Sequence, residues 1–296
     1  MIYLLTVNYY STQLIERLIH SITTHPETPH QIVIVNNSPD DHELPQLRAK
    51  SLHILEAQTN LGFSKACNLG LTWIYTQDSK AIVWIINPDT YLPEKTLTKI
   101  PILFETYPEL SILGTYIYTP TGEVWFAGGQ FIPERGAILC NKSLPTTAEN
   151  TYTTCDWVSG CSLLLNLQQF PSCPQFDPAY FLYYEDFDFC LRYAKQGHKI
   201  AITSQITVVH QPSAIANRNI TKKIAHSTYS YLLTLERYTN KAIFLLRLLR
   251  LTLHALILLL PKPQTALGKL IGVSSYLGRL TLPSLKARDS SFNQRA

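Results

Sequence analysis

Buried strands are predicted where apolar residues run without interruption, and the clearest such run is Ile82–Ile86. Five consecutive apolar residues, four of them Ile or Val, are typical of a strand that is buried on both faces of a sheet. Proline offers no N–H to a neighbouring strand, so Pro88 ends the run and leaves Asp89 just past the strand's carboxyl end. In an open α/β sheet, that edge faces the ligand crevice.

The first 118 residues alternate between such runs and segments with helical spacing. Apolar residues recur at positions 14, 18, 19 and 22, for example, which is the spacing of one buried helix face. The predicted order is strand 2–7, helix 12–24, strand 31–35, strand 52–55, helix 64–76, strand 82–86, helix 93–107 and strand 111–118. This alternation predicts an α/β domain with a mostly parallel sheet and helices on both of its faces.

Three polar clusters follow strands of this predicted sheet: Asn8-Tyr9, the turn from Asn36 to Asp41, and the segment that ends at Asp89. Because parallel strands end at the same edge, we expect the clusters to converge in one ligand site. A carboxylate at this edge is suited to hold a divalent cation through oxygen. The alternative for Asp89 is that it caps the helix expected to begin near residue 93.

A second group of carboxylates opens the helix predicted over residues 185–196: Glu185, Asp186 and Asp188. Negative charge in a first turn is favoured by the helix dipole, so capping is one interpretation of all three. Asp188 lies four residues before Arg192, the spacing of a surface ion pair. Asp186 instead flanks the apolar stripe of the helix, where partial desolvation raises a carboxyl pKa and suits a general base.

Two further segments bear on the site. Residues 119–155 are irregular and rich in glycine and proline, so we expect a hairpin and a mobile loop there. Short strands are expected at 200–203 and 206–209, and His210 follows directly. A histidine in this position is structural unless it lies near Asp89, where it would be a metal ligand.

The C-terminal segment differs in composition from the rest of the chain. After a tyrosine-rich helix predicted over 219–240, residues 242–260 are apolar but interrupted by two arginines and a histidine. This pattern argues against a transmembrane helix and favours an amphipathic helix in the membrane interface, with packing against a partner subunit as the alternative. Residues 241–296 carry nine Lys and Arg against one acid, a net +8, so the first 240 residues carry −4. We therefore expect peripheral contact with an anionic membrane.

The composition bounds the class of protein. A chain of 296 residues with 46% hydrophobic and 16% charged residues fits one large domain, here residues 1–215, with an extension at 216–296. The six cysteines form no CxxC pair and have no zinc-type spacing to histidine, so reduced thiols in a cytoplasmic protein are expected. Residues 1–3 lead directly into a strand, so no signal peptide is expected.

Two nucleotide-binding motifs are absent from the sequence. No GxGxxG turn follows the first strand, which disfavours dinucleotide binding, and no GxxxxGK[ST] loop occurs, which excludes a P-loop. A sugar nucleotidylyltransferase would need a glycine-rich, arginine-bearing loop after the first strand, and Asn8-Tyr9-Tyr10-Ser11 contains neither residue. No nucleic-acid partner is expected either.

Taken in order, five motifs resemble those of family 2 glycosyltransferases with the GT-A fold, in the rhamnosyltransferase-like branch. The resemblance covers about residues 1–215. The motifs are Val7-Asn8-Tyr9, the turn from Asn36 to Asp41, the segment from Asn60 to Gly70, Asn87-Pro88-Asp89, and Trp157-Val158-Ser159-Gly160 followed by the segment from Phe181 to Arg192 with His210 behind it. One residue departs from the pattern, because Asn36 stands where the family usually has Asp, which puts the nucleotide preference in doubt.

The resemblance implies a role for each motif. Asp89 and His210 would hold Mg²⁺ or Mn²⁺, and Asp186 beside Glu185 would supply the catalytic base. The nucleotide-sugar site would be formed by Asn8, Tyr9, Asn36, Asn37, Asp41, Asn60, Gly62, Lys65, Asn68 and Asn87. The acceptor side would include Trp157, Gly160 and Asp188.

The function expected from these roles is inverting, metal-dependent transfer of a sugar, with rhamnose as one candidate, from a nucleotide-diphosphate donor. The acceptor would be a saccharide or a lipid-linked saccharide of cell-surface polysaccharide synthesis, at the inner face of the plasma membrane. The alternative is a catalytically silent, nucleotide-sugar-binding subunit of an assembly complex. The sequence leaves the oligomeric state open, a homo-oligomer included.

Overall fold

The computed structural model describes residues 1–23, 28–44, 47, 52–143, 151–211 and 219–281. It divides into two compact units, residues 1–132 with 137–215 and residues 133–136 with 216–296. Part of the expected loop, residues 144–150, and the end of the basic tail, residues 282–296, lie outside the described residues.

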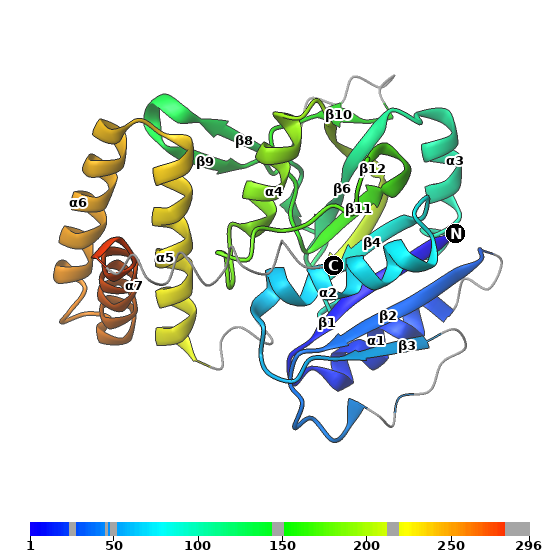
Figure 1. Ribbon diagram of the computed structural model, residues 1–296, viewed down its shortest axis with the longest axis horizontal. Coiled ribbons are helices and arrows are strands. Elements are labelled where there is room, and N and C mark those ends of the chain that lie inside the picture. Colours follow the sequence, from blue (N-terminus) through cyan, green and yellow to red (C-terminus); the bar gives the residue numbers. More distant parts are fainter. Residues whose placement is uncertain (24–27, 45–46, 48–51, 144–150, 212–218, 282–296) are drawn as a thin grey trace, which may run out of the picture. The chain divides into compact units, whose positions relative to one another are not determined.

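The larger unit is built on one mixed sheet (Figure 1). Its strands run in the order β10-β12-β6-β11-β4-β1-β2-β3, with β5 paired to β12 and β7 to β6. The bounds are β1 Ile2–Asn8, β2 His30–Asn36, β3 Leu52–Glu56, β4 Ile82–Ile86, β5 Thr90–Tyr91, β6 Leu110–Tyr118, β7 Val124–Phe126, β10 Thr153–Thr154, β11 Ser162–Asn166 and β12 Lys199–His210. A separate hairpin pairs β8 (Gly129–Ile132) with β9 (Ala137–Cys140).

The expectation of a mostly parallel sheet is confirmed for one half, but the other half is mixed, because β5, β7, β10 and β11 pair antiparallel with their neighbours. The neighbours β3, β2, β1 and β4 are all parallel, as are β6 and β12. Between β4 and β6, however, β11 runs antiparallel to both. The backbone of β11 pairs with both neighbours, and its leucine side chains are buried. An antiparallel strand needs no crossover helix to reach this position. In addition, residues 199–210 form one strand with an irregularity between Thr203 and Thr207, where two strands were expected.

Helices cover both faces of the parallel half. The chain moves from β1 to β2 in one direction along the sheet and from β3 to β4 in the other. Right-handed crossovers therefore place α1 (Thr12–Thr23) and α2 (Gly62–Gln77) on opposite faces, as Figure 1 shows. The strand order reverses between β1 and β4, which is where ligands bind in open α/β sheets. The fold thus points to the carboxyl ends of these two strands.

The remaining helices of this unit are α3 (Lys99–Thr106) and α4 (Glu185–Ala194), with a short 3₁₀ turn at 167–169, and a second such turn, at 133–135, belongs to the smaller unit. Helix α3 begins six residues later than expected because Thr90–Tyr91 pairs with β12 and turns occupy the segment that follows. Asp89 is therefore not a helix cap, and that interpretation is wrong.

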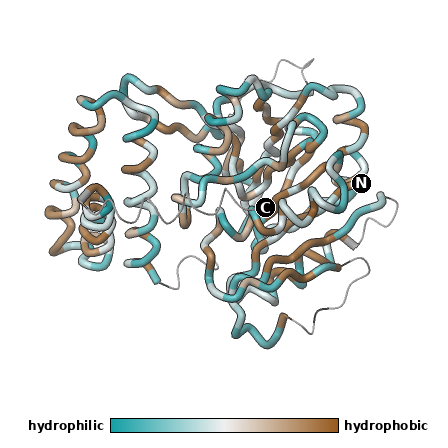
Figure 2. The backbone as a smooth tube through the Cα atoms, in the orientation of Figure 1, coloured by the Kyte–Doolittle hydropathy of each residue, from teal (hydrophilic) through white to brown (hydrophobic). Residues whose placement is uncertain are grey.

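The core of the sheet is apolar, and a hydrogen-bonded group of three polar side chains lies at its centre. Figure 2 colours most of the central strands as hydrophobic, and β1, β4 and β11 are almost wholly buried. At the centre, the indole of Trp84 donates to Ser162 Oγ (2.9 Å), and Thr115 Oγ1 donates to the same oxygen (2.7 Å). These bonds satisfy the indole N–H of Trp84 and the hydroxyl groups of Thr115 and Ser162, whereas the buried hydroxyl of Thr6 on β1 has no hydrogen-bond partner within the described residues.

The smaller unit contains three helices: α5 (Ile220–Tyr238), α6 (Lys241–Ile257) and α7 (Pro263–Thr281). Asn219 and Asn240 cap the first two, each accepting a backbone N–H through its side chain. Gly268 and Gly272 let α7 approach α5 closely, because a Cβ at either position would lie within 2.7 Å of a carbonyl oxygen of α5. Among the described helices, none is both long enough and apolar enough to cross a membrane.

Candidate active site

The candidate site begins where three parallel strands end abreast. The register pairs Asn8 with Asn36 and Asn36 with Glu56, so the last residues of β1, β2 and β3 form one row. Asn8 and Asn36 are 0% and 2% exposed. Buried amides require hydrogen-bond partners, and the turn that follows β2 supplies them.

Asn8 organises this turn. Its Nδ2 donates to Asn36 Oδ1 (3.1 Å), Ser38 Oγ (3.3 Å) and Asp41 Oδ2 (2.9 Å). Burial by itself would raise the pKa of Asp41, but hydrogen bonds from Asn8, Thr12 and two backbone N–H groups outweigh it and lower the pKa. The turn thus holds an ionised carboxylate beside the strand ends.

A second set of amide bonds ties this turn to the start of α2. Asn37 Nδ2 donates to Asn60 Oδ1 (3.0 Å), and the N–H of Leu61 donates to Asn37 Oδ1 (2.7 Å). Gly62 follows with φ +76°, and a Cβ there would lie 2.5 Å from the carbonyl oxygen of Phe181. Gly62 is therefore required for the close approach of α2 to the segment that precedes α4.

Two expected nucleotide-site residues of α2 have other surroundings. Asn68 donates to the carbonyl oxygen of Phe176 (2.8 Å) and accepts its N–H (2.7 Å), so both polar atoms hold the backbone of that residue. The structure therefore gives Asn68 a positioning role. Lys65 is exposed on the first turn of α2.

Asp89 and His210 are brought together by strand pairing. The short strand β5 pairs antiparallel with the end of β12, and the N–H of Gln211 donates to the backbone oxygen of Asp89 (2.8 Å). His210 Nε2 lies 3.3 Å from Asp89 Oδ1, and the two residues are 6% and 9% exposed. The indole of Trp125, on β7, packs edge-to-face on the imidazole at 4.7 Å between ring centroids.

These two residues fit a divalent cation. The contact between Nε2 and Oδ1 is not a hydrogen bond, since Asp89 Oδ1 makes none within the described part of the chain. The other ring nitrogen, His210 Nδ1, makes none there either. A buried carboxylate oxygen and an imidazole nitrogen that face each other in this way suit a shared ion such as Mn²⁺. The described residues hold no group of three or more His, Cys, Asp or Glu that could by themselves hold a metal ion. Ligand and water oxygens would therefore complete the coordination.

The antiparallel strand β11 brings a third segment to this edge. Because Ser162 pairs with Ile86, the residues just before β11 lie beside the carboxyl end of β4. The N–H of Asn87 donates to the carbonyl oxygen of Cys161 (3.0 Å), and the N–H of Gly160 donates to Asp186 Oδ2 (2.8 Å). The segment Gly160-Cys161 thus joins the Asp89 region to the acidic start of α4.

Glu185 and Asp186 differ in their surroundings. Glu185 is 6% exposed and its Oε2 has no hydrogen-bond partner among the described residues, so burial and then the charge of Asp186 raise its pKa well above the ordinary value. Asp186 is half-buried, and burial raises its pKa as well, against two backbone N–H donors, Gly160 and Phe187, that favour the ionised form. Asp186 is therefore the more accessible and more readily ionised carboxyl group of the pair.

The cation position and the acidic pair belong to one site. Burial raises the pKa of the Cys161 thiol, and the charges of Asp89 and Asp186 raise it further, so both carboxylates lie near this residue. Burial and the charges of Glu185 and Asp89 likewise raise the pKa of Tyr183 to about 12.

The backbone before the acidic pair is strained. Tyr183 and Tyr184 have φ values of 70° and 65°, a region that non-glycine residues rarely adopt. Two such residues in succession turn the chain sharply into α4. Strain of this kind is often found at functional sites, and here it fixes the direction in which Glu185 and Asp186 point.

Two expected acceptor-side residues are buried. The expected ion pair between Asp188 and Arg192 is confirmed at 2.7 Å, but its expected place on the surface is wrong for Asp188, which is 0% exposed and so has no surface for an acceptor. Trp157 is 7% exposed and packs between Phe126 and Phe187. Both side chains are therefore packed inside the protein and do not line the site.

Sequence reasoning missed Trp125 and Glu56, which lie beside His210 and Asn36 respectively. Trp125 belongs to a three-residue strand inside the segment expected to be irregular, and Glu56 ends a weakly patterned strand. The available signals were a tryptophan within a glycine-rich segment and a carboxylate at the end of an expected strand.

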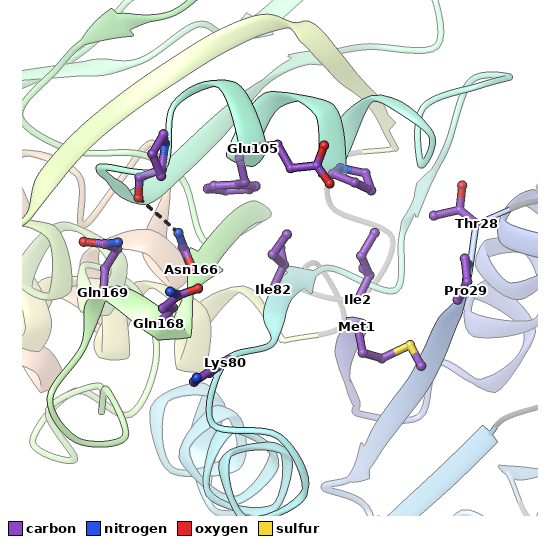
Figure 3. A pocket seen from close by; sticks show the side chains of 13 residues that line it. Met1, Ile2, Thr28, Pro29, Lys80, Ile82, Glu105, Asn166, Gln168 and Gln169 are labelled. Carbon is purple, nitrogen blue, oxygen red and sulfur yellow. Dashed lines mark hydrogen bonds between the residues drawn. The ribbon is translucent and has the colours of Figure 1, made fainter.

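A cavity of about 460 Å³ lies away from this site, at the opposite edge of the sheet (Figure 3). It is lined by the starts of β1 and β4, including Ile2 and Ile82, and by polar side chains such as Asn166 and Gln169. None of the candidate site residues contributes to it.

Comparison with solved structures identifies the class of fold. The chain is similar to a mannosyltransferase from Pyrobaculum calidifontis solved with GDP-Man and Mn²⁺ (14% identity, TM-score 0.53, 99% of this chain and 80% of that one). It is also similar to GalNAc-T7 solved with UDP, GalNAc and Mn²⁺ (11%, TM-score 0.56, 80% and 47%) and to S. aureus TarS (14%, TM-score 0.53, 78% and 39%). The shared architecture is the GT-A glycosyltransferase fold.

The family follows from sequence. The sequence model of the family "Glycosyl transferase family 2" matches residues 3–161, which is more than half of the chain. The chain therefore belongs to this family. It is 21% identical over 211 residues to the low-salt glycan biosynthesis hexosyltransferase Agl10 of Haloferax volcanii. That match covers 70% of this chain and 66% of Agl10, slightly less than two thirds of the relative's length.

Proposed function

We propose that this chain is an inverting, metal-dependent glycosyltransferase that uses a nucleotide-diphosphate sugar. The observation that carries the proposal is that the segment Gly160-Cys161 links the pair Asp89 and His210 to Asp186 at the carboxyl edge of the sheet: Cys161 accepts the N–H next to the cation position, that of Asn87, and Gly160 donates to Asp186. One ligand at this edge would meet a cation position and a candidate base together. Family membership and the shared fold support the same conclusion.

Asp186 is the proposed catalytic base. Ionised and half-buried, it would take the proton of an acceptor hydroxyl as that oxygen attacks the anomeric carbon from the face opposite the nucleotide. The N–H groups of Gly160 and Phe187 hold the carboxylate in place, each at 2.8 Å. Burial raises the pKa of the neighbouring Glu185, which favours its protonated form and so leaves Asp186 as the group of the pair that would accept the proton.

Asp89 and His210 would hold Mg²⁺ or Mn²⁺, which when bound offsets the negative charge of the departing diphosphate. The nucleoside would lie over the row of strand ends from β1 to β3, beside the ionised Asp41. The sugar could be a hexose, with rhamnose as one candidate, and the acceptor a saccharide or lipid-linked saccharide of a surface glycan.

Calorimetric titration of the purified chain with UDP, dTDP and GDP, each with and without Mn²⁺, tests this function. Binding of one nucleotide that tightens with Mn²⁺ supports the proposal and identifies the donor. No binding of any of the three contradicts it. Cation-dependent binding without transfer to any acceptor would indicate a silent, sugar-nucleotide-binding subunit.

We also propose that the smaller unit contacts the cytoplasmic face of an anionic membrane. Much of the α6 tube in Figure 2 has hydrophobic colours. Six of its apolar side chains are 49% to 72% exposed: Leu245, Leu246, Leu249, Leu253, Leu256 and Ile257. Exposed basic residues flank them at Lys241, Arg250 and Lys262. An apolar face bordered by positive charge suits anionic headgroups above an acyl layer.

Vesicle flotation tests this contact. The full chain is expected to float with vesicles that contain phosphatidylglycerol, and a Leu249→Glu, Leu253→Glu variant is expected to stay in solution. Ile102→Glu is the matched control, because Ile102 is 64% exposed but lies on α3 of the larger unit. Flotation of the double variant like the parent chain overturns the proposal, as does a parent chain that does not float.

A further inference from the structure

Asn36, the residue that departs from the family pattern, uses its acceptor atom within the protein. Its Oδ1 accepts from Asn8 Nδ2 (3.1 Å) and from the N–H of Ser38 (3.3 Å). Its Nδ2 donates to Glu56 Oε2 (2.8 Å). With 2% of its surface exposed, Asn36 offers no free acceptor to a ligand at this edge. An aspartate at position 36 would have presented a negatively charged acceptor at this edge.

Glu56 occupies the neighbouring place in the row. The register sets it directly beside Asn36 at the end of β3, and the N–H of Ala57 donates to the carbonyl oxygen of Asn36 (3.0 Å), which fixes the backbone there. The side chain is exposed, and Oε1 makes no hydrogen bond or ion pair with the residues that the structure describes. A carboxylate only accepts hydrogen bonds, so its free oxygen is suited to a donor group of a ligand.

We propose that Glu56, oriented by Asn36, is the carboxylate that recognises the nucleoside of the sugar donor. Its Oε1 would accept a hydrogen bond from an imino N–H of the base or from a ribose hydroxyl. The charge that the family usually carries at the end of β2 is in this chain supplied from the end of β3. This inference rests on the proposed function, because it assigns a residue to the nucleotide site of that same reaction.

The pairing explains why the two residues belong together. An amide that donates to a carboxylate makes a charge-assisted hydrogen bond and holds the longer glutamate side chain in one orientation. An aspartate at position 36 would instead place two carboxylates within hydrogen-bond distance, which disfavours ionisation of both. Asparagine at 36 is thus the residue type that a carboxylate at 56 requires.

Isothermal titration with the identified nucleoside diphosphate and with inorganic pyrophosphate, both with Mn²⁺, tests the inference. In Glu56→Gln, the hydrogen bond from Asn36 can remain, and only the charge is lost. We expect about tenfold weaker binding of the nucleoside diphosphate and unchanged binding of pyrophosphate. Glu43→Gln, an exposed glutamate after the same turn, is the matched control and is expected to bind like the parent chain.

The outcomes separate the two proposals. If the parent chain binds nucleotide with Mn²⁺ and Glu56→Gln binds it equally well, the role of Glu56 is overturned while the proposed function stands. If the parent chain binds no nucleotide, both fail. An equal loss for pyrophosphate and nucleotide also overturns the role, because it would indicate a general charge effect. For a uridine donor, a larger penalty with UDP than with CDP assigns the contact to the imino N–H, and an equal penalty assigns it to the ribose.

Discussion

Replacing Asp186 with asparagine tests the proposed chemistry most directly. The substitution keeps the shape of the side chain and removes its ability to accept a proton. Asp186 accepts two backbone N–H groups at 2.8 Å, from Gly160 and Phe187. An asparagine can accept one of them through its oxygen, and its NH₂ group must then face the other donor.

The expected effects differ greatly in size. Loss of a general base lowers the transfer rate by about 10²–10⁴-fold, or about 3–5 kcal/mol of transition-state stabilisation. One unsatisfied N–H costs about 1–3 kcal/mol of stability. Removal of a carboxyl group whose pKa is raised by burial offsets part of that cost. In a unit of this size each kcal/mol corresponds to about 2–4 °C in Tm, so the variant is expected to stay folded.

The assay combines single-turnover transfer, nucleotide titration and thermal unfolding. Asp186→Asn is expected to lose transfer while its Kd for the nucleotide with Mn²⁺ stays within about threefold of the parent value. Asp177→Asn is the control, because Asp177 is also half-buried and accepts a backbone N–H, from Ala179 at 2.8 Å. Transfer that survives in Asp186→Asn, or nucleotide binding that is lost along with transfer, would refute the assignment of Asp186 as the base.

Three further outcomes follow from the same geometry. Asp89→Ala is expected to remove the Mn²⁺ dependence of nucleotide affinity in calorimetry, and a dependence that persists would contradict the cation position. Glu185→Gln is expected to raise Tm at pH 7 but not at pH 4. Because the pKa of Glu185 is raised in the folded state, the native protein binds more protons than the unfolded chain at neutral pH. The parent chain therefore loses stability as pH rises from the unfolded pKa toward the folded one, and the glutamine variant does not. An unchanged Tm difference across that range would argue against the raised pKa. Gly62→Ala is expected to lower stability by about 1–3 kcal/mol in denaturant unfolding, because φ is +76° and a Cβ would lie 2.5 Å from the Phe181 oxygen.

The parallel half of the sheet could be predicted because its central strands are continuous apolar runs. Such runs can be recognised without knowing which strands they pair with. Ile82–Ile86 is a strand with the predicted bounds, β1 is one residue longer than predicted at its end, and β2 is one residue longer at each end. The antiparallel insertion of β11 could not be predicted, because a buried strand reads the same in either direction. Only the pairing of Ser162 with Ile86 shows that Gly160 and Cys161 reach the site edge.

The sequence predicted most of the residues that reach the candidate site, but it predicted the role of each residue less well. Asp89, His210 and Asp186 converge, although they come from three distant segments, because strand ends and the start of α4 share one edge. The sequence could not show that the amide of Asn68 is occupied by a backbone segment. It also could not show that Asp188 has no exposed surface, because burial depends on packing against residues far along the chain.

The acidic pair shows how neighbouring residues of one helix turn can acquire different chemistry. On sequence grounds Glu185 and Asp186 are both first-turn carboxylates, and the position of Asp186 beside the apolar stripe predicts it as the base. The structure separates them by solvent access and by donors: Glu185 is buried with an unpartnered oxygen, whereas Asp186 is half-buried and receives two N–H groups. Two charges this close cannot both form at low cost, so the proton stays on the group that is less well solvated. The donor from Gly160, which β11 brings to this edge, therefore contributes to making Asp186 the ionised partner.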